Sequence, residues 1–307
     1  RMYPMDFEEF CYALGEKNII KYIRLCFEKQ QPLEGDLHHK AMLLFKQYML
    51  VGGMPMSVSK YLENNRSFVD SDTEKRDIFT LYKNDINKAD TKYRSKISAI
   101  FEQIPVFLSQ QEKRVRLSNI EEKSSFPMYH ETFHWLASSM VCNECFKCND
   151  PNIGLSINED RNYIKCYVGD TGLLVSHAFS ESEISDGNLY KQILHDNLSL
   201  NEGMLFENAI AQGLVSNGYP LFFYTHYNSE KHRNDIEIDF VISNGSKLKP
   251  KIYPIEVKSG KKYSITSLER FMDKFKNRIG NGYVIHLKNL SKKDNILYIP
   301  SYVTFCL

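Results

Sequence analysis

The 307-residue chain lacks the features that mark membrane, secreted and disulfide-stabilised proteins. It has no run approaching the ~18 consecutive apolar residues that a transmembrane helix needs. Its first residues, Arg1 to Asp6, contain no apolar segment typical of a secretory signal. The seven cysteines are an odd number scattered through a long sequence, which favours reduced thiols over a disulfide framework. We therefore expect a cytoplasmic protein that makes no contact with a membrane.

A large excess of charge of one sign is also missing, because the formal net charge is only +1. The charges are unevenly distributed, however, since residues 201–307 carry 15 Lys and Arg against 10 Asp and Glu. The first 200 residues carry 24 against 28. A local basic surplus favours contact with a polyanion through the C-terminal part. Ordinary contents of hydrophobic residues (42%) and charged residues (25%) exclude a disordered or collagen-like chain.

The length exceeds what one hydrophobic core usually supports, so we expect a mixed α/β protein of several domains. Residues 1–88 carry apolar side chains at helical spacing, for example Phe7, Phe10, Cys11 and Leu14. This part of the sequence predicts a helical region.

Residues 89–180 follow the order of elements of a winged helix-turn-helix. A helix after Lys96 leads into a short basic link at residues 113–117, and a second helix ends near Met140. Two predicted strands come next, Val141 to Phe146 and Tyr163 to Val168. Modules of this kind bind DNA or make contacts with other proteins.

The polar segment 181–200 is predicted to be a linker, and residues 201–307 an α/β domain that opens with a helix near Glu202. The predicted strands are Pro220 to Thr225, Glu237 to Ile242, Lys251 to Lys258, Tyr283 to Leu287 and Ile296 to Ile299, with a helix from Ser267 to Lys276. About a hundred residues is the commonest size of a domain.

Two of these strands carry charged residues on the face opposite their core residues. Side chains alternate across a strand, so Glu256 and Lys258 share one face while Ile255 and Val257 enter the core. Asp239 occupies the equivalent position of the preceding strand. The loop at residues 243–250 joins the two strands, and we expect the two carboxylates to be neighbours in a hairpin.

Two converging carboxylates repel each other and favour a hard cation, which indicates Mg²⁺ or Mn²⁺. The predicted ligands are Asp239 and Glu256, with Glu207 of the opening helix as a third. Lys258 completes the predicted catalytic group, because its charge can orient a water and stabilise a scissile phosphate. The alternative is a solvated strand face with a weak ion pair. The basic residues expected to bind phosphates around this cleft are Lys261, Lys262, Lys274 and Lys276.

This order of carboxylate strand, Glu-x-Lys strand and basic helix resembles that of the PD-(D/E)XK nucleases, although Ile238 replaces the Pro of their motif. The resemblance implies a restriction-endonuclease-like α/β domain over residues 201–307. Six segments also resemble a prokaryotic family of AAA-type ATPases. They are Met2 to Phe10, Val51 to Pro55, Tyr82 to Ile86, Asp170 to Leu174, Leu205 to Asn208 and Ile255 to Gly260. The resemblance implies that the chain is the part of such a protein that follows its ATPase module.

A phosphate-binding loop is absent from the sequence. The motif needs Gly-x-x-x-x-Gly-Lys-Ser/Thr, whereas Gly260-Lys261 has Ile255 in the first Gly position and Lys262 in the last. We expect an upstream ATPase module to be missing from this chain, which begins at Arg1 instead of Met. The chain alone should bind no ATP, and a micromolar Kd in calorimetry would contradict this prediction.

Two other patterns indicate zinc. His130, Glu131 and His134 match His-Glu-x-x-His, a metalloprotease signature, with Glu144 or Glu159 as conceivable third ligands. We instead expect this helix to bury an apolar stripe, with both histidines at its flank. Cys142, Cys145, Cys148 and Cys166 include Cys-x-x-Cys spacing, but we expect core thiols, because strand alternation places Cys142 and Cys145 on opposite faces.

The leading hypothesis is therefore a metal-dependent phosphodiesterase that acts on DNA with Asp239, Glu256 and Lys258. The first alternative is a non-catalytic nucleic-acid-binding or regulatory region of an AAA-type ATPase. The second is a zinc metalloprotease that uses His130, Glu131 and His134.

Overall fold

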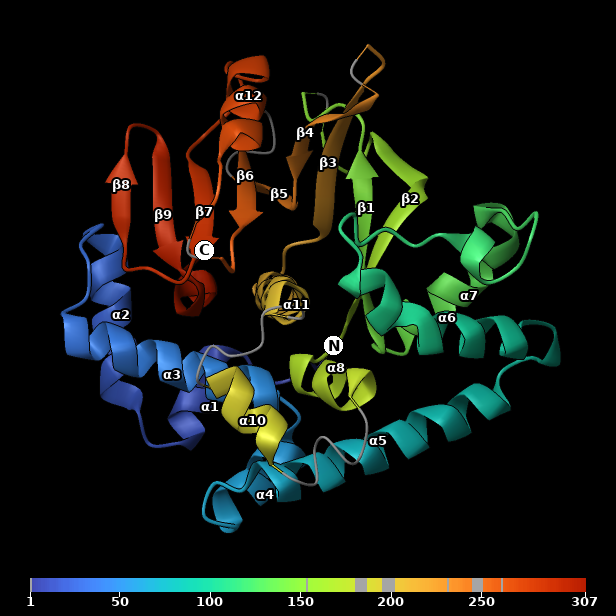
Figure 1. The fold of residues 1–307 in the computed structure, drawn as a ribbon, viewed down its shortest axis with the longest axis horizontal. Helices are drawn as coiled ribbons and strands as arrows, with labels where there is room; N and C mark the ends of the chain where they lie inside the picture. Colours follow the sequence, from blue (N-terminus) through green and yellow to red (C-terminus); the bar gives the residue numbers. More distant parts are fainter. Residues whose placement is uncertain are drawn as a thin grey trace.

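A computed structural model describes residues 2–152, 154–179, 187–194, 202–230, 232–244, 251–260 and 262–307. The fold is mixed α/β, with a helical N-terminal region followed by sheets, as the sequence predicts (Figure 1). Among the helices within these ranges, none is both long enough and apolar enough to cross a membrane.

The N-terminal helices form where the predicted helical region lies. They are α1 (Phe7–Ala13), α2 (Lys17–Glu28), α3 (Gly35–Val51), α4 (Pro55–Glu63) and α5 (Phe68–Lys88). Local sequence fixes their starts. Asp6 and Glu9 form a reciprocal capping box at α1, and Pro55 occupies the first turn of α4.

The next elements keep the predicted order but not the predicted arrangement. They are α6 (Thr91–Ser109), η1 (Leu117–Asn119), α7 (Phe126–Ser138), β1 (Cys142–Cys148), β2 (Glu159–Val168), α8 (Thr171–Ala178) and α10 (Asn188–Leu194). The β1–β2 hairpin is not a free wing, because β1 also pairs in parallel with β3 (Leu221–Asn228) of the C-terminal segment. Within the predicted linker, residues 181–200, the structure describes Gly187 and the helix α10.

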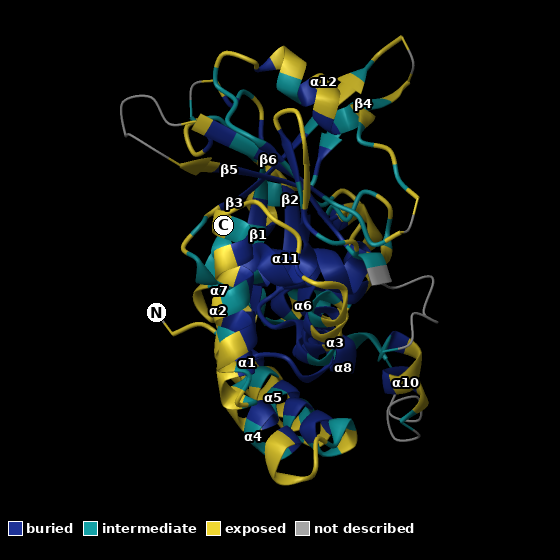
Figure 2. Cartoon of the chain, turned by 90° about the vertical axis from the view of Figure 1, so that its left-hand side faces the viewer, coloured by how far each residue is buried: buried dark blue, intermediate teal, exposed yellow. Residues whose placement is uncertain are grey.

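Two sheets stand side by side over the helix α11 (Glu202–Ser216) (Figure 1). The four-stranded sheet has the order β2-β1-β3-β4, and the five-stranded sheet has the order β5-β6-β7-β9-β8. The remaining elements are β4 (Arg233–Ile238), β5 (Phe240–Asn244), β6 (Lys251–Val257), α12 (Thr266–Lys274), β7 (Gly282–His286), β8 (Ser291–Lys293), β9 (Ile296–Pro300) and η2 (Ser301–Cys306). Helix α11 is buried along its length, so it is the centre of the fold (Figure 2).

The single strand predicted at residues 237–242 is in fact two strands. The chain bends at Asp239 and passes from β4 in one sheet to β5 in the other. The side chain at the bend makes a hydrogen bond to a neighbouring strand. Asp239 Oδ2 accepts from the Val257 backbone N–H at 2.8 Å. The bend therefore places Asp239 between the two sheets.

Motifs far apart in the sequence meet beside α11. The buried Asp170 carboxylate accepts hydrogen bonds from the backbone N–H groups of Gly53 (2.5 Å) and Leu173 (2.9 Å) and from the Gln212 side chain (3.2 Å). Gly52 has a positive φ of 81°, and a Cβ there would lie 2.1 Å from Asp170 Oδ1. These contacts join the N-terminal helices to α11, which carries Glu207, and account for two of the six motifs structurally, Val51 to Pro55 and Asp170 to Leu174.

Candidate functional site

A half-open cavity of about 390 Å³ lies where β4, β5, β6 and the first turn of α12 meet α11. Its charged lining residues are Lys113, Glu207, Glu237, Asp239, Glu256 and Lys258. All four residues predicted for the site, Asp239, Glu256, Lys258 and Glu207, therefore lie in one cavity. The structure adds Lys113 and Glu237 to them.

Asp239 and Glu256 are brought together by strand pairing. Strands β5 and β6 are antiparallel, with Phe240 paired to Ile255, so the preceding Asp239 comes opposite Glu256. Lys258 follows the end of β6, where its backbone N–H donates to Ile285 O at 2.8 Å. This bond keeps the chain extended beside β7 and aims the Lys258 side chain into the cavity.

Glu256 is a buried carboxylate with an incomplete set of partners. The residue is 1% exposed, and its Oε2 atom accepts no hydrogen bond within the described part of the chain. The Lys258 ammonium lies 2.8 Å from Oε2 and forms an ion pair with it. Burial raises the pKa of Glu256 to about 7, and Lys258 only partly opposes this. Without a further cation, Glu256 holds its proton near neutral pH for part of the time.

The pKa of Asp239 is also raised. Burial is the largest cause and repulsion from Glu207 the next, while Lys165 and Lys113 act in the opposite direction. Glu237 shows the same direction, because burial raises its pKa as well. Three carboxyl groups of this cavity thus carry an unfavourable negative charge, which a bound cation would relieve.

Glu207 differs from these three carboxyl groups because both of its oxygens already have cationic partners. Lys113 Nζ lies 2.9 Å from Oε2, and Lys165 Nζ lies 3.2 Å from Oε1. The Tyr167 hydroxyl donates to Oε1 at 2.5 Å. Burial alone would raise the pKa of Glu207, but the two lysines outweigh it and lower the pKa to about 2. We therefore leave Glu207 out of the ligand set that we propose below.

Sequence reasoning missed Lys113, Lys165 and Tyr167. Both lysines were assigned to the predicted winged helix, Lys113 to its basic link and Lys165 to its hairpin. The available signal was a charged residue inside the apolar strand at residues 163–168, a position where an unpaired charge is rarely tolerated.

The lysines predicted to bind phosphates are placed unequally. Lys262 and Lys276 are exposed. Lys274 is exposed too, but its ammonium donates to the Tyr224 hydroxyl at 2.9 Å and lies over the rings of Tyr224 and Phe275. Lys261 lies outside the described residues. Lys262 and Lys276 therefore remain the better candidates for phosphate contacts.

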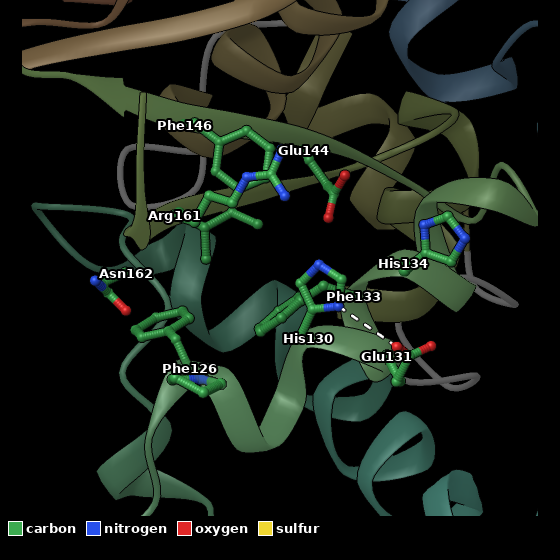
Figure 3. Close-up of a pocket in the computed structure, with 11 residues that line it drawn as sticks. Phe126, His130, Glu131, Phe133, His134, Glu144, Phe146, Arg161 and Asn162 are labelled. Atoms are coloured by element: carbon green, nitrogen blue, oxygen red, sulfur yellow. Dashed lines mark ion pairs between the residues drawn. The ribbon is translucent and has the colours of Figure 1, made fainter. Parts of the chain in front are cut away.

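A larger cavity of about 550 Å³ lies between α7 and the β1–β2 hairpin. His130 and His134 on α7 are both exposed, and Glu144 of β1 reaches toward them across the opening (Figure 3). His130 pairs with Glu131 at 3.6 Å. Within the described ranges, no group of three or more His, Cys, Asp or Glu residues is placed to hold a metal ion. The predicted apolar stripe is present, since Tyr129, Phe133 and Leu136 are buried.

We predict that α7 binds no zinc, because this buried stripe accounts for the helix without a metal. Metal analysis of the purified protein should find less than stoichiometric zinc, and His134→Ala should not change the amount. Stoichiometric zinc that is lost in His134→Ala would contradict this prediction.

The four cysteines of the hairpin region are all buried and free. Cys142 and Cys145 are both enclosed although strand alternation separates them, and both α7 and α11 pack against β1. Burial raises the pKa of Cys145 and brings that of Cys148 to about 12, which keeps both in the thiol form.

Two domain families match the chain, and both are described as domains of unknown function. DUF8612 matches residues 42–183 and DUF4143 matches residues 202–302. No curated protein and no solved structure matches the chain. The second match contains Glu207, Asp239, Glu256 and Lys258, so the candidate site lies in a domain that is found in C-terminal regions of AAA-type ATPase-like proteins.

Proposed function

We propose that this chain hydrolyses phosphodiester bonds of DNA with a divalent metal ion, at the cavity formed by Asp239, Glu256 and Lys258. The observation that carries the proposal is the pair of desolvated carboxylates on adjacent strands, with a lysine ammonium 2.8 Å from one of them. Perturbed carboxyl groups that converge in a cavity are typical of functional sites.

Within the described residues no group of three or more His, Cys, Asp or Glu is placed to hold a metal ion, so a magnesium or manganese ion would have only two protein ligands here. Mg²⁺ commonly keeps several waters and takes only one or two carboxylates together with substrate phosphates. Glu256 Oε2 is buried with the Lys258 ammonium 2.8 Å away as its partner, so it has a further lone pair to offer a cation. Asp239 Oδ2 is occupied by the Val257 N–H, which leaves Oδ1 for the ion. Asp239 and Glu256 would therefore hold the metal.

A bound Mg²⁺ polarises a phosphoryl oxygen and lowers the pKa of water. The protein contributes position and charge. Lys258, paired with Glu256, is placed to donate from Nζ to an oxygen of the scissile phosphate and to stabilise the charge that develops there. The Thr266 and Ser267 side chains at the start of α12 line the same cavity and offer hydroxyl donors for the other phosphate oxygens.

DNA would reach this cavity through phosphate contacts made by lysines around it. Helix α7, the second helix of the predicted winged helix, contains no Lys or Arg. Lys and Arg supply most of the affinity for phosphates, so we assign DNA binding to the cavity, and assign α7 to contacts with another part of the assembly. An upstream ATPase module is the partner that we propose, and buried free thiols support a cytoplasmic location.

A second candidate function is a non-catalytic regulatory or nucleic-acid-binding region of an AAA-type ATPase. The ion pairs of Glu207 favour it, because they remove the third carboxylate from the predicted metal site. Mn²⁺ soaked into crystals separates the candidates by its anomalous signal. A peak between Asp239 and Glu256 is expected for the nuclease, and a peak at His130 and His134 would support the protease. The absence of any peak would favour the non-catalytic role.

A further inference from the structure

Lys165 is a buried ammonium placed between two carboxylates of the candidate site. It projects from β2, is 2% exposed, and lies 3.2 Å from Glu207 Oε1 and 3.9 Å from Asp239 Oδ1. The ring of Phe223 lies 5.2 Å from its Nζ atom. A charge in such surroundings persists only when it is paired. Burial alone would lower the pKa of Lys165, but Glu207 and Asp239 outweigh it and raise the pKa.

Lys113 supplies a second cation to the same glutamate. Its ammonium lies 2.9 Å from Glu207 Oε2, and its side chain is 17% exposed. The backbone of Lys113 has a positive φ of 49°, an uncommon conformation for a residue other than glycine. Strain of this kind persists where the surroundings over-determine the conformation, and it clusters at functional sites. The link between α6 and η1 is thus bent so that Lys113 reaches Glu207.

The geometry indicates what these two cations replace. Nucleases that use two metal ions hold them ~3.5–4 Å apart with carboxylates that both ions share. Asp239 Oδ1 and Glu207 Oε1 are the pair of oxygens that would hold a second ion here, and Lys165 lies between them. A divalent ion at this position would also be repelled by two ammonium groups.

We infer that Lys165 and Lys113 act as fixed cations in the place of a second metal ion, so that the site takes one divalent ion, at Asp239 and Glu256. The inference rests on the proposed function. It makes Lys165 a positioning residue. Its ammonium occupies the space between Glu207 and Asp239 where a second ion would bind, and it does not contact the phosphate.

The number of Mn²⁺ ions bound by the full chain tests this inference without any measurement of activity. Calorimetric titration, with electron paramagnetic resonance to count bound ions, should give one ion for the wild type and two for Lys165→Met. The double variant Lys165→Met/Glu207→Gln should return to one ion, because it removes a ligand of the second site. Lys147→Met, on the neighbouring strand β1 and outside the cavity, is the matched control and should keep one ion.

The outcomes separate this inference from the proposed function. One ion in both the wild type and a folded Lys165→Met would overturn the inference and leave the proposed function intact. Two ions on the wild type would overturn the inference whatever the variants do. No ion on the wild type would overturn the proposed function, and the inference with it. If Lys165→Met fails to fold, Lys165→Gln removes the same charge but keeps a polar side chain at the position; it should also bind two ions, and one ion on it would overturn the inference.

Discussion

Lys258→Ala should keep the affinity for Mn²⁺ and reduce the rate of DNA cleavage on the order of a hundredfold or more. Lys258 contributes charge and not coordination, so its loss removes an interaction with the developing phosphate charge. Asp239→Ala and Glu256→Ala should lose both Mn²⁺ binding and cleavage, because each removes a ligand. The assay is Mn²⁺-dependent cleavage of single-stranded, duplex and branched DNA, with calorimetry for the metal.

Lys293→Ala provides the matched control for a lost positive charge. Lys293 is exposed on β8, which forms one edge of the five-stranded sheet, whereas β5 forms the other. Its removal should leave the cleavage rate unchanged. Equal activity in the wild type and Lys258→Ala would refute the catalytic role of Lys258. A wild type that binds Mn²⁺ tightly but cleaves none of the three substrates would favour the non-catalytic alternative.

The strand pattern was sufficient to predict Asp239, Glu256 and Lys258 as neighbours. Alternation assigned Glu256 and Lys258 to one face, and the short connection between the two strands implied an antiparallel pair. Both features are local, because they depend on residues close together in sequence. The bend at Asp239 was not predictable in the same way, because it depends on a hydrogen bond from Val257 across the sheet.

The surroundings of Glu207 depend on contacts that sequence patterns do not show. Lys165 reaches Glu207 because β1 pairs in parallel with β3, across the segment predicted as a linker. The order of helix, helix and hairpin is common to a free winged helix and to a hairpin that joins a larger sheet. Only the pairing distinguishes them, and it is decided by non-local packing. The same pairing brings the Tyr167 hydroxyl to Glu207.

These contacts compensate the negative charge of Glu207 and Glu256 to different extents. Glu207 is stabilised by two lysines, so its negative charge costs the folded state little. Lys258 only partly compensates the burial of Glu256, which raises the pKa of this carboxyl group, so the charged form of Glu256 destabilises the fold. Functional sites commonly lower the stability of the folded protein, and removing an uncompensated buried charge then stabilises it.

Glu256→Gln should therefore stabilise the metal-free protein at pH 8 and have little effect at pH 4. The pKa of Glu256 rises from 4.5 to about 7 on folding, so the folded state holds a proton that the unfolded state releases. The wild type is thus most stable below pH 4.5 with respect to this group, and its free energy of unfolding falls as the pH rises to 7. A shift of this size corresponds to at most about 3 kcal/mol.

Divalent metal should reverse this order of stability. Saturating Mn²⁺ stabilises the wild type at pH 8 by binding the folded state alone, whereas Glu256→Gln lacks one of the two ligands and should gain little. Denaturant unfolding at pH 4, 6 and 8, with and without Mn²⁺, gives the difference between the two proteins and cancels the other titrating groups. Glu122→Gln, at an exposed position, should follow the wild type throughout. A Glu256→Gln protein less stable than the wild type at pH 8 without metal would show that Lys258 already compensates the carboxylate, and the reason to place a cation there would be lost.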